Sequence, residues 1–338
     1  MILDMRRKPL RLAPATAAAF ALLTLLPAAA GPWAAQAREA APEQAAGGGS
    51  GPLQATLEIL KPFTYEGDPL LVRLAVFNTT DKPYDNAAGV DLLGGLQVVG
   101  STGGSLALKH KGGHDARQQP AVIPGGGFFG VIQDITSVVP DVSKAGVYTL
   151  SWKKGDLSAP AVTVKVIPKF DPAAPYVAVM ETDLGSLEFD LLTKEAPKHV
   201  QNFYDLSHQG FYDNTLIHQV IKGIELRGGD PSGSGRGWPG YVLEQEISPG
   251  LKHRRGTLSA IVSGPRQDNG SQFVVTLGPM DRYDGQLSIF GQLKGGEETL
   301  RAIENLPTSG QMEAPYYKPL TPVLVRSVTI RKAAGTGM

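Results

Sequence analysis

The 338-residue sequence contains no cysteine, which excludes disulfide bonds, thiolate metal sites and cysteine nucleophiles. It also lacks an excess of charge of either sign, because 32 basic side chains balance 32 acidic ones. A net charge of zero gives no general electrostatic reason to bind nucleic acid or an anionic membrane, so neither is expected as a partner. The 42% of hydrophobic residues and the length are instead typical of a globular protein with about two domains.

The hydrophobic run near the start of the sequence is short for a membrane-spanning helix. The apolar segment at residues 13–26 has about 14 residues, short of the ~20 that a membrane helix needs. It follows the basic stretch Arg6-Arg7-Lys8 and precedes the small-x-small motif Ala35-Gln36-Ala37. This order predicts a signal peptide at residues 1–37 and an exported protein, periplasmic or secreted, with an uncleaved membrane anchor as the alternative.

Residues 38–52 are rich in Ala and Gly, which predicts a flexible linker. Residues 53–168 then contain short apolar and β-branched runs separated by Gly and Pro, without a helical period. This texture predicts a β-sandwich. The runs lie at residues 56–60, 70–77, 96–99, 128–132, 146–152 and 162–167. Two passages that contain such runs, residues 67–78 and 145–152, resemble bacterial immunoglobulin-like domains.

A Pro-rich joint at residues 169–175 separates this part from a different pattern at residues 176–332, and residues 333–338 form a short tail. A hairpin is expected around Asp183-Leu-Gly185. The apolar stripe of residues 194–206, with Pro197 suited to a first turn, predicts a helix. A second helix is expected at residues 297–305, and a last strand at residues 323–330.

Several blocks of sequence within this second part occur in a characteristic order. They include the Gly-rich stretch 228–241 and the segment Asn269-Gly-Ser-Gln-Phe273, and the others lie at residues 195–203, 210–213, 218–221, 255–259, 283–285 and 289–291. Together the blocks resemble the cyclophilin-type peptidyl-prolyl cis-trans isomerases, as a divergent bacterial member. The resemblance implies an eight-stranded antiparallel β-barrel capped by two helices, so the whole chain is expected to be mostly β.

The resemblance also implies a chemistry. Rotation about an X-Pro amide is slowed by a resonance barrier of ~18–20 kcal/mol, and no bond is broken during it. An isomerase therefore needs no nucleophile, metal or cofactor. It needs an apolar pocket for the proline ring and a hydrogen-bond donor that favours the twisted amide over the planar one. The family uses an Arg as this donor, with a Gln and several apolar side chains around the ring.

Carried over position by position, the resemblance indicates an eroded active site. Gln219 stands where the family has its Arg, and Gln272 is retained, so these two amides are the expected catalytic donors. Arg227 replaces the first family Gln, and because it lies two residues from Glu225 in an expected strand, the two could pair. The expected substrate-binding residues are Ile224, Glu225, Arg227, Ile261, Val274, Arg282, Tyr283 and Leu287.

Three functions are compatible with these observations. The first is a peptidyl-prolyl isomerase of reduced activity that assists the folding of exported proteins by binding their proline-containing segments. The second is a catalytically inactive peptide- or protein-binding module of the cell envelope, which a bridge from Glu225 to Arg227 or Arg282 would favour. The third is a structural role for the sandwich, through contact with another envelope protein.

Overall fold

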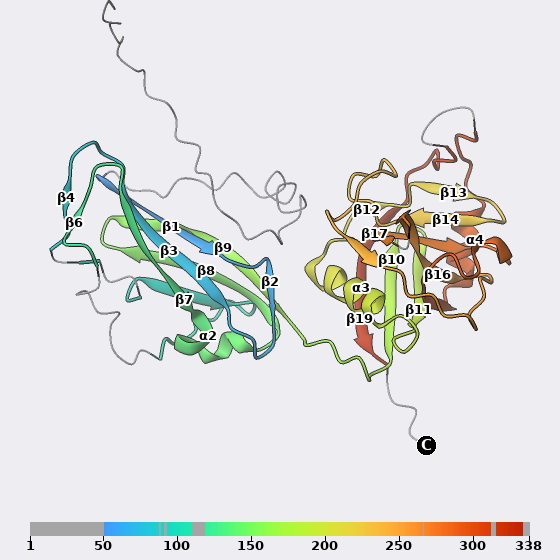
Figure 1. Ribbon diagram of the computed structural model, residues 1–338, viewed down its shortest axis with the longest axis horizontal. Helices are drawn as coiled ribbons and strands as arrows, with labels where there is room; N and C mark the ends of the chain where they lie inside the picture. Colours follow the sequence, from blue (N-terminus) through green and yellow to red (C-terminus); the bar gives the residue numbers. More distant parts are fainter. Residues whose placement is uncertain are drawn as a thin grey trace, which may run out of the picture.

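The computed structural model describes residues 51–333, except residues 88, 91–92, 110–118, 266 and 312–315. The expected signal peptide, residues 38–50 of the linker and residues 334–338 of the tail lie outside the described residues. Four sheets and a few short helices make up the described part, so the prediction of a mostly β fold is confirmed (Figure 1). In the described residues, no helix is long and apolar enough to span a membrane.

The first part of the chain contains two larger sheets and a small one. The three-stranded sheet has the order β1 (Leu53–Ile59), β3 (Leu71–Asn78) and β7 (Phe128–Asp134). The four-stranded sheet has the order β2 (Phe63–Tyr65), β9 (Leu157–Ile167), β8 (Gly146–Lys154) and β5 (Leu96–Gly100). The remaining elements are the pair β4 (Tyr84–Asp85) and β6 (Val122–Ile123) and two short helices, α2 (Ile135–Val138) and η2 (Pro140–Ser143).

One hydrophobic cluster joins these sheets. It takes Leu57 and Val76 from the three-stranded sheet and Leu150 and Trp152 from the four-stranded sheet, all of them buried. Each of the six runs expected as strands overlaps an observed strand. The sequence did not predict β2, β4 or β6, because strands of two or three residues are too short to carry a period-2 pattern.

The second part is built on one curled sheet. Its strands run in the order β12 (Thr215–Leu216), β19 (Leu324–Lys332), β10 (Tyr176–Thr182), β11 (Gly185–Leu191), β18 (Ile289–Gly295), β16 (Thr257–Gly264), β17 (Gln267–Thr276), β14 (Glu225–Gly228) and β13 (Gln219–Ile221), and β15 (Val242–Glu244) pairs with β17. The edge strands β12 and β13 are separated in sequence by just Ile217 and His218, so the sheet curls until its edges approach each other. It has ten strands rather than the expected eight, and three of them, β12, β13 and β15, are only two or three residues long.

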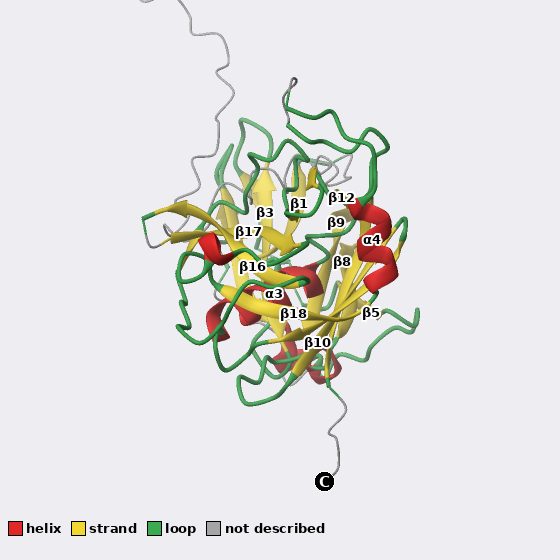
Figure 2. Cartoon of the chain, turned by 90° about the vertical axis from the view of Figure 1, so that its right-hand side faces the viewer, coloured by secondary structure: helices red, strands yellow, loops and turns green. Residues whose placement is uncertain are grey.

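Two α-helices pack on this sheet, α3 (Pro197–Gln209) against β17, β18 and β19, and α4 (Glu297–Glu304) against β11 and β13 (Figure 2). A 3-10 helix, η3 (Asp281–Tyr283), precedes β18. Helix α3 begins at Pro197 and not at the expected residue 194, because a proline disfavours the helical conformation of the residue before it. It ends at Gln209, and the next residue, Gly210, caps the helix with a positive φ of 78°.

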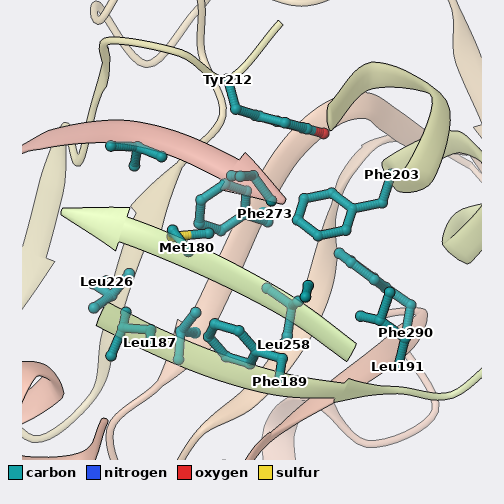
Figure 3. Close-up of a cluster of buried hydrophobic side chains, with 14 of the residues drawn as sticks. Met180, Leu187, Phe189, Leu191, Phe203, Tyr212, Leu226, Leu258, Phe273 and Phe290 are labelled. Carbon is teal, nitrogen blue, oxygen red and sulfur yellow. The ribbon is translucent and has the colours of Figure 1, made fainter. Parts of the chain in front are cut away.

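The interior of the curled sheet is filled by large apolar side chains (Figure 3). Phe203 of α3 lies with its ring centroid 5.1 Å from that of Tyr212 and 5.4 Å from that of Phe290. Phe273 of β17 and Leu226 of β14 are buried in the same cluster. Because side chains alternate along a strand, the neighbours of Phe273 and Leu226 in β17 and β14 face the other side of the sheet, where the candidate site lies.

The Pro-rich joint connects the two parts of the chain (Figure 1), and side chains of the two parts contact each other beside it. The phenol of Tyr65 in β2 donates a hydrogen bond of 2.7 Å to Asp205 of α3. Tyr204 donates to the carbonyl of Pro168 at 3.0 Å, and Phe170 stacks on Tyr176 with ring centroids 5.1 Å apart. The joint is therefore held by side chains of both parts, while the domain boundaries drawn from the sequence stay predictions.

Candidate functional site

A groove of about 580 Å³ opens on the outer face of the curled sheet. Strands β13, β14, β16 and β17, the Gly-rich loop after β14 and the loop before β19 supply its walls. The lining residues are His218, Gln219, Arg227, Ser234, Gly235, Arg236, Ile261, Val262, Asn269, Gln272 and Tyr316. Four of the ten residues proposed from the sequence lie in this lining, namely Gln219, Arg227, Ile261 and Gln272.

Strand register builds the floor beneath the groove. Gln219 of β13 is directly opposite Arg227 of β14, and Arg227 is directly opposite Val274 of β17. Directly opposed residues of antiparallel strands point to the same face, with Cβ atoms about 4.5–5.5 Å apart. The three side chains therefore form one row, and Val274 is buried at its inner end.

A tight turn brings the first two members of this row together. Gly223, between β13 and β14, has a φ of 72°, a backbone conformation that glycine adopts at little cost. The turn lets Val220 and Leu226 pair on the inner face, where both are buried in the core. Because of the same alternation, Gln219 and Arg227 remain on the outer face.

A buried carboxylate lies next to the groove. Glu225 is 1% exposed, and its Oε1 atom is 2.7 Å from Nε and 2.6 Å from Nη2 of Arg227. Its Oε2 atom accepts a hydrogen bond of 2.5 Å from the phenol of Tyr283. The pairing of Glu225 with Arg227, expected because two residues of a strand separated by one share a face, is confirmed.

Arg282 does not bridge to Glu225. Its guanidinium lies over the ring of Tyr283, 5.0 Å from the ring centroid, and Nη2 is 3.3 Å from the phenol oxygen. Burial, and then the hydrogen bond to Glu225, raise the pKa of Tyr283. Tyr283 therefore remains a neutral donor, which is the form that the buried carboxylate requires.

Both expected amide donors are occupied by backbone carbonyls. The Nε2 atom of Gln219 donates to the carbonyl of Tyr316 at 3.1 Å. The Nε2 atom of Gln272 donates to the carbonyl of Gly237 at 2.5 Å and lies 3.4 Å from that of Gly235. Neither amide is aimed into the groove without a partner.

The remaining sequence-predicted residues lie outside the groove lining. Ile224 belongs to the turn between β13 and β14, and the amide of Leu277 donates to its carbonyl at 2.8 Å. Leu287 follows η3, and its amide donates to the carbonyl of Tyr283. The structure thus divides the predicted pocket into a groove and a neighbouring polar network of Glu225, Tyr283 and Arg282.

The Gly-rich loop forms the wall of the groove beside His218. Asp230 is fully buried, and its Oδ1 atom accepts hydrogen bonds of 2.7 Å from the amide and the hydroxyl of Ser232. Burial raises the pKa of Asp230, but these and further backbone hydrogen bonds, from Gly237 and Gly235, lower it below its ordinary value. An ionised carboxylate thus fixes the loop.

His218 contributes a buried ring to the same wall. Burial lowers its pKa; the charge of Asp230 opposes this and the charge of Arg227 adds to it. Its Nδ1 atom is buried and has no hydrogen-bond partner among the described residues. The ring is therefore neutral near pH 7, so His218 forms part of the groove wall and is not a charged donor.

Sequence reasoning did not single out Tyr316, Arg236 or Asn269 as site residues. Arg236 and Asn269 lie within blocks that carried the family resemblance, so the blocks themselves were a signal. The side-chain oxygen of Asn269 accepts from the amides of Ser271 and Gln272, which holds Gln272 in place. Tyr316 reaches the groove from a loop that lies 97 residues after Gln219 in sequence. No pattern in the sequence identifies it as a site residue.

A Ser-His-Asp series that includes Ser259 of β16 has no access to a substrate. His253 Nε2 is 3.0 Å from the hydroxyl of Ser259, and His253 Nδ1 is 3.0 Å from Asp284 Oδ1. Ser259 is fully buried, so it cannot act as a nucleophile on an external substrate. Among the described residues no group of three or more His, Asp or Glu side chains could hold a metal ion.

Comparison with known proteins finds similarity in the second part of the chain. Residues 177–330 match the family model of the cyclophilin type peptidyl-prolyl cis-trans isomerases. A peptidyl-prolyl cis-trans isomerase-like 1 of Gibberella zeae is 44% identical over 137 residues, which cover 39% of this chain and 84% of that protein. The peptidyl-prolyl cis-trans isomerase cypE of Dictyostelium discoideum is 38% identical over 133 residues, covering 38% and 85%.

A similar chain occurs among solved structures. The crystal structure of a cyclophilin type peptidyl-prolyl cis-trans isomerase of Cryptosporidium parvum aligns with a TM-score of 0.44 and 36% sequence identity. The alignment covers 47% of this chain and 99% of that one.

Proposed function

The chain belongs to the cyclophilin-type peptidyl-prolyl cis-trans isomerase family, and from this premise we propose that its second part isomerises X-Pro bonds of extended peptide segments with reduced activity. The observation that carries the proposal is the groove over the row of Gln219, Arg227 and Val274. An extended substrate peptide can lie in this groove against Ile261 and Val262, while the polar side chains of Gln219 and Arg227 contact its X-Pro amide.

The reduction in rate follows from two replacements. Gln219 offers a neutral donor where the family has a charged one, and a neutral hydrogen bond contributes ~0.5–1.5 kcal/mol against ~1.5–3 kcal/mol for a charged one. Glu225 introduces a buried carboxylate where the family has an apolar side chain. A lost stabilisation of about 1.4 kcal/mol lowers a rate tenfold. We therefore expect catalysis at least about tenfold slower than at a site that has the family's residues at these two positions.

The test is a cis/trans exchange measurement by NMR on a short X-Pro peptide with the full chain. We expect the wild type to accelerate exchange above the spontaneous rate. Val262→Trp, at an exposed position of the groove, should block the acceleration, whereas Leu184→Trp, equally exposed but in the turn between β10 and β11, should preserve it. Exchange at the spontaneous rate with wild-type protein would contradict the proposal.

A second candidate is a catalytically inactive module that binds proline-containing peptides. The ion pair of Glu225 with Arg227 and the hydrogen bond from Tyr283 favour it, because they place polar groups where the family has apolar contacts to the proline ring. Saturable peptide binding in an NMR titration, without faster exchange, would select this function.

The cellular role belongs to the same proposal. The basic stretch, short apolar segment and small-x-small motif of residues 1–37 support export to the periplasm or the medium, where clients would be proline-containing segments of exported proteins. Mass spectrometry of the mature chain should find its first residue at position 38. Full-length protein in the cytoplasmic fraction would argue against export.

We also propose that residues 53–168 form an immunoglobulin-like sandwich that contacts another envelope protein. Two sheets that share one hydrophobic cluster support the sandwich, and the contact of Tyr65 with Asp205 supports a defined position beside the isomerase part. Cross-linking in intact cells, with and without residues 53–168, would test whether this part recruits a partner.

A further inference from the structure

Isomerisation of an X-Pro bond gains from a charged donor that faces the substrate amide. As an X-Pro bond twists, the resonance that spreads the nitrogen lone pair is lost, and the nitrogen becomes a better hydrogen-bond acceptor. A donor that contacts the nitrogen in this state lowers the barrier, because the interaction is stronger in the transition state than in the planar amide. A cation performs this task better than a neutral amide.

The neutral amides of the groove are poorly placed for the task. Gln219 donates to the carbonyl of Tyr316, and Gln272 donates to the carbonyl of Gly237. To contact a substrate, either amide would first have to break a hydrogen bond that the protein itself makes. The groove lining also contains two guanidinium groups, those of Arg227 and Arg236.

Arg227 differs from Arg236 in being held in place. Its Nε and Nη2 atoms both contact Oε1 of Glu225, at 2.7 Å and 2.6 Å, and Glu225 is in turn held by Tyr283. The side chain of Arg227 is 34% exposed, and its contacts with Glu225 involve Nε and Nη2 but not Nη1. One edge of the guanidinium is thus anchored to a buried carboxylate while the charged group still reaches the groove.

The register of β13 and β14 explains why a side chain at position 227 can act as a donor to the substrate. Arg227 is directly opposite Gln219 on the same face of the sheet. The resemblance assigns Arg to the position of Gln219 and Gln to the position of Arg227, so this chain has the two residue types exchanged across one strand pair. Opposed Cβ atoms are about 4.5–5.5 Å apart, so a side chain at position 227 faces the same part of the groove as one at position 219.

We propose that Arg227 is the catalytic donor of this protein: its guanidinium, positioned by Glu225, donates a hydrogen bond to the prolyl nitrogen as the amide twists. The inference rests on the proposed isomerase function and identifies the residue on which that function depends. Glu225 is then a positioning residue, because it contacts Arg227 and not the substrate.

Arg227→Gln tests the proposal in the full chain, with exchange NMR on the same X-Pro peptide. We expect kcat to fall at least tenfold while KM changes less than about twofold, because the lost interaction forms in the transition state. Adding Gln219→Arg to Arg227→Gln, which moves the guanidinium back across the strand pair, should restore most of the rate. Arg326→Gln removes a paired arginine of the same sheet outside the groove and should leave the rate unchanged.

A second variant guards against loss of folding. Because Arg227→Gln leaves the Glu225 carboxylate buried without its cation, Glu225→Gln/Arg227→Gln removes both charges and should show the same fall in kcat with wild-type peptide affinity in an NMR titration. Glu225→Gln alone should lower kcat less than Arg227→Gln, since it frees the guanidinium without removing it.

The outcomes separate the two proposals. A wild-type protein that accelerates exchange and an Arg227→Gln variant that matches it would overturn the role of Arg227 and leave the isomerase function standing. A fall in kcat with Arg236→Gln but not with Arg227→Gln would assign the donor to Arg236. A wild-type protein without catalysis would overturn both proposals.

Discussion

The phenol of Tyr283 donates a hydrogen bond of 2.5 Å to the buried carboxylate of Glu225, 58 residues away in sequence. The other carboxylate oxygen pairs with Arg227, so a single buried charge connects η3 to the strand that lies beneath the groove. A buried carboxylate is tolerated when its charge and its hydrogen-bonding capacity are both satisfied. The shape of the site therefore depends on these partners acting together.

The first prediction concerns the stability of this pair. Arg227→Ala leaves the Glu225 carboxylate buried without a cation, so we expect the free energy of unfolding in urea to fall by roughly 3 kcal/mol. Glu225→Gln/Arg227→Ala, which removes both charges, should cost clearly less. Arg73→Ala, which breaks an exposed pair with Glu58, should cost at most ~1 kcal/mol. Equal losses for the single and double variants would contradict a buried uncompensated charge.

The second prediction concerns the pH dependence of stability near α3. His199 is buried between Asp268 and Glu246, with its ring nitrogens 3.1 Å and 2.6 Å from their carboxylate oxygens. Burial lowers the pKa of His199, but the hydrogen bonds to the two carboxylates outweigh it, and the pKa lies above 6.5. A raised folded-state pKa gives a stabilisation that is complete below pH 6.5 and is lost as the pH rises through the folded value.

Urea unfolding at a series of pH values checks this sign. The free energy of unfolding of the wild type should decline as the pH rises above 6.5, and His199→Asn should remove that part of the decline. His208 of the same helix provides the contrast, because burial lowers its pKa and its contribution is lost toward low pH. An unchanged decline in His199→Asn would show that another group titrates.

The third prediction concerns the contact between the two parts of the chain. Burial raises the pKa of Asp205 to about 6, although the hydrogen bond from Tyr65 acts in the opposite direction. Since the protonated form is favoured in the folded state, the contribution of Asp205 is present below its ordinary pKa of 3.8 and is lost as the pH rises through about 6. A carboxyl ¹³C NMR titration should therefore find a midpoint near 6.

Tyr65→Phe provides the control for this titration. The variant removes the hydrogen bond that stabilises the ionised form, so the midpoint of Asp205 should move upward. Asp205→Asn should make the contact between β2 and α3 independent of pH in the same range. A midpoint at the ordinary 3.8 in the wild type would mean that the carboxyl is solvated and the contact is open in solution.

The fourth prediction concerns cyclosporin. The resemblance to the family implies that Arg282 stands where members have a Trp that contributes to binding this inhibitor, and Arg282 is exposed and lies over the ring of Tyr283. A charged, solvated side chain cannot replace a large apolar one in such a contact, so we expect no inhibition at nanomolar concentrations. Calorimetry with wild type and Arg282→Trp provides the measurement, and the variant should bind more tightly. Nanomolar affinity of the wild type would refute this prediction.

Much of the fold could be predicted from the sequence, because local patterns of residues indicated the same helices and strands that the structure contains. The hairpin around Asp183-Leu-Gly185 lies between β10 and β11, and the second helix begins at the expected Glu297. The ordered blocks led to the family, which the comparisons support over residues 177–330. Where local chemistry was overlooked, boundaries shifted, as at Pro197, because a proline restricts the residue before it.

The sequence by itself determined which residue types stand at the site: a glutamine at position 219, an arginine at position 227 and a carboxylate between β-branched and apolar neighbours. It also indicated that Glu225 and Arg227 share a face, since that follows from the period of a strand. The tertiary structure alone decided what each side chain contacts. Tyr316, from the loop before β19, accepts from the amide of Gln219, and Tyr283, from η3, donates to the second oxygen of Glu225. Such contacts depend on where the folded sheet brings these distant segments, not on any local pattern.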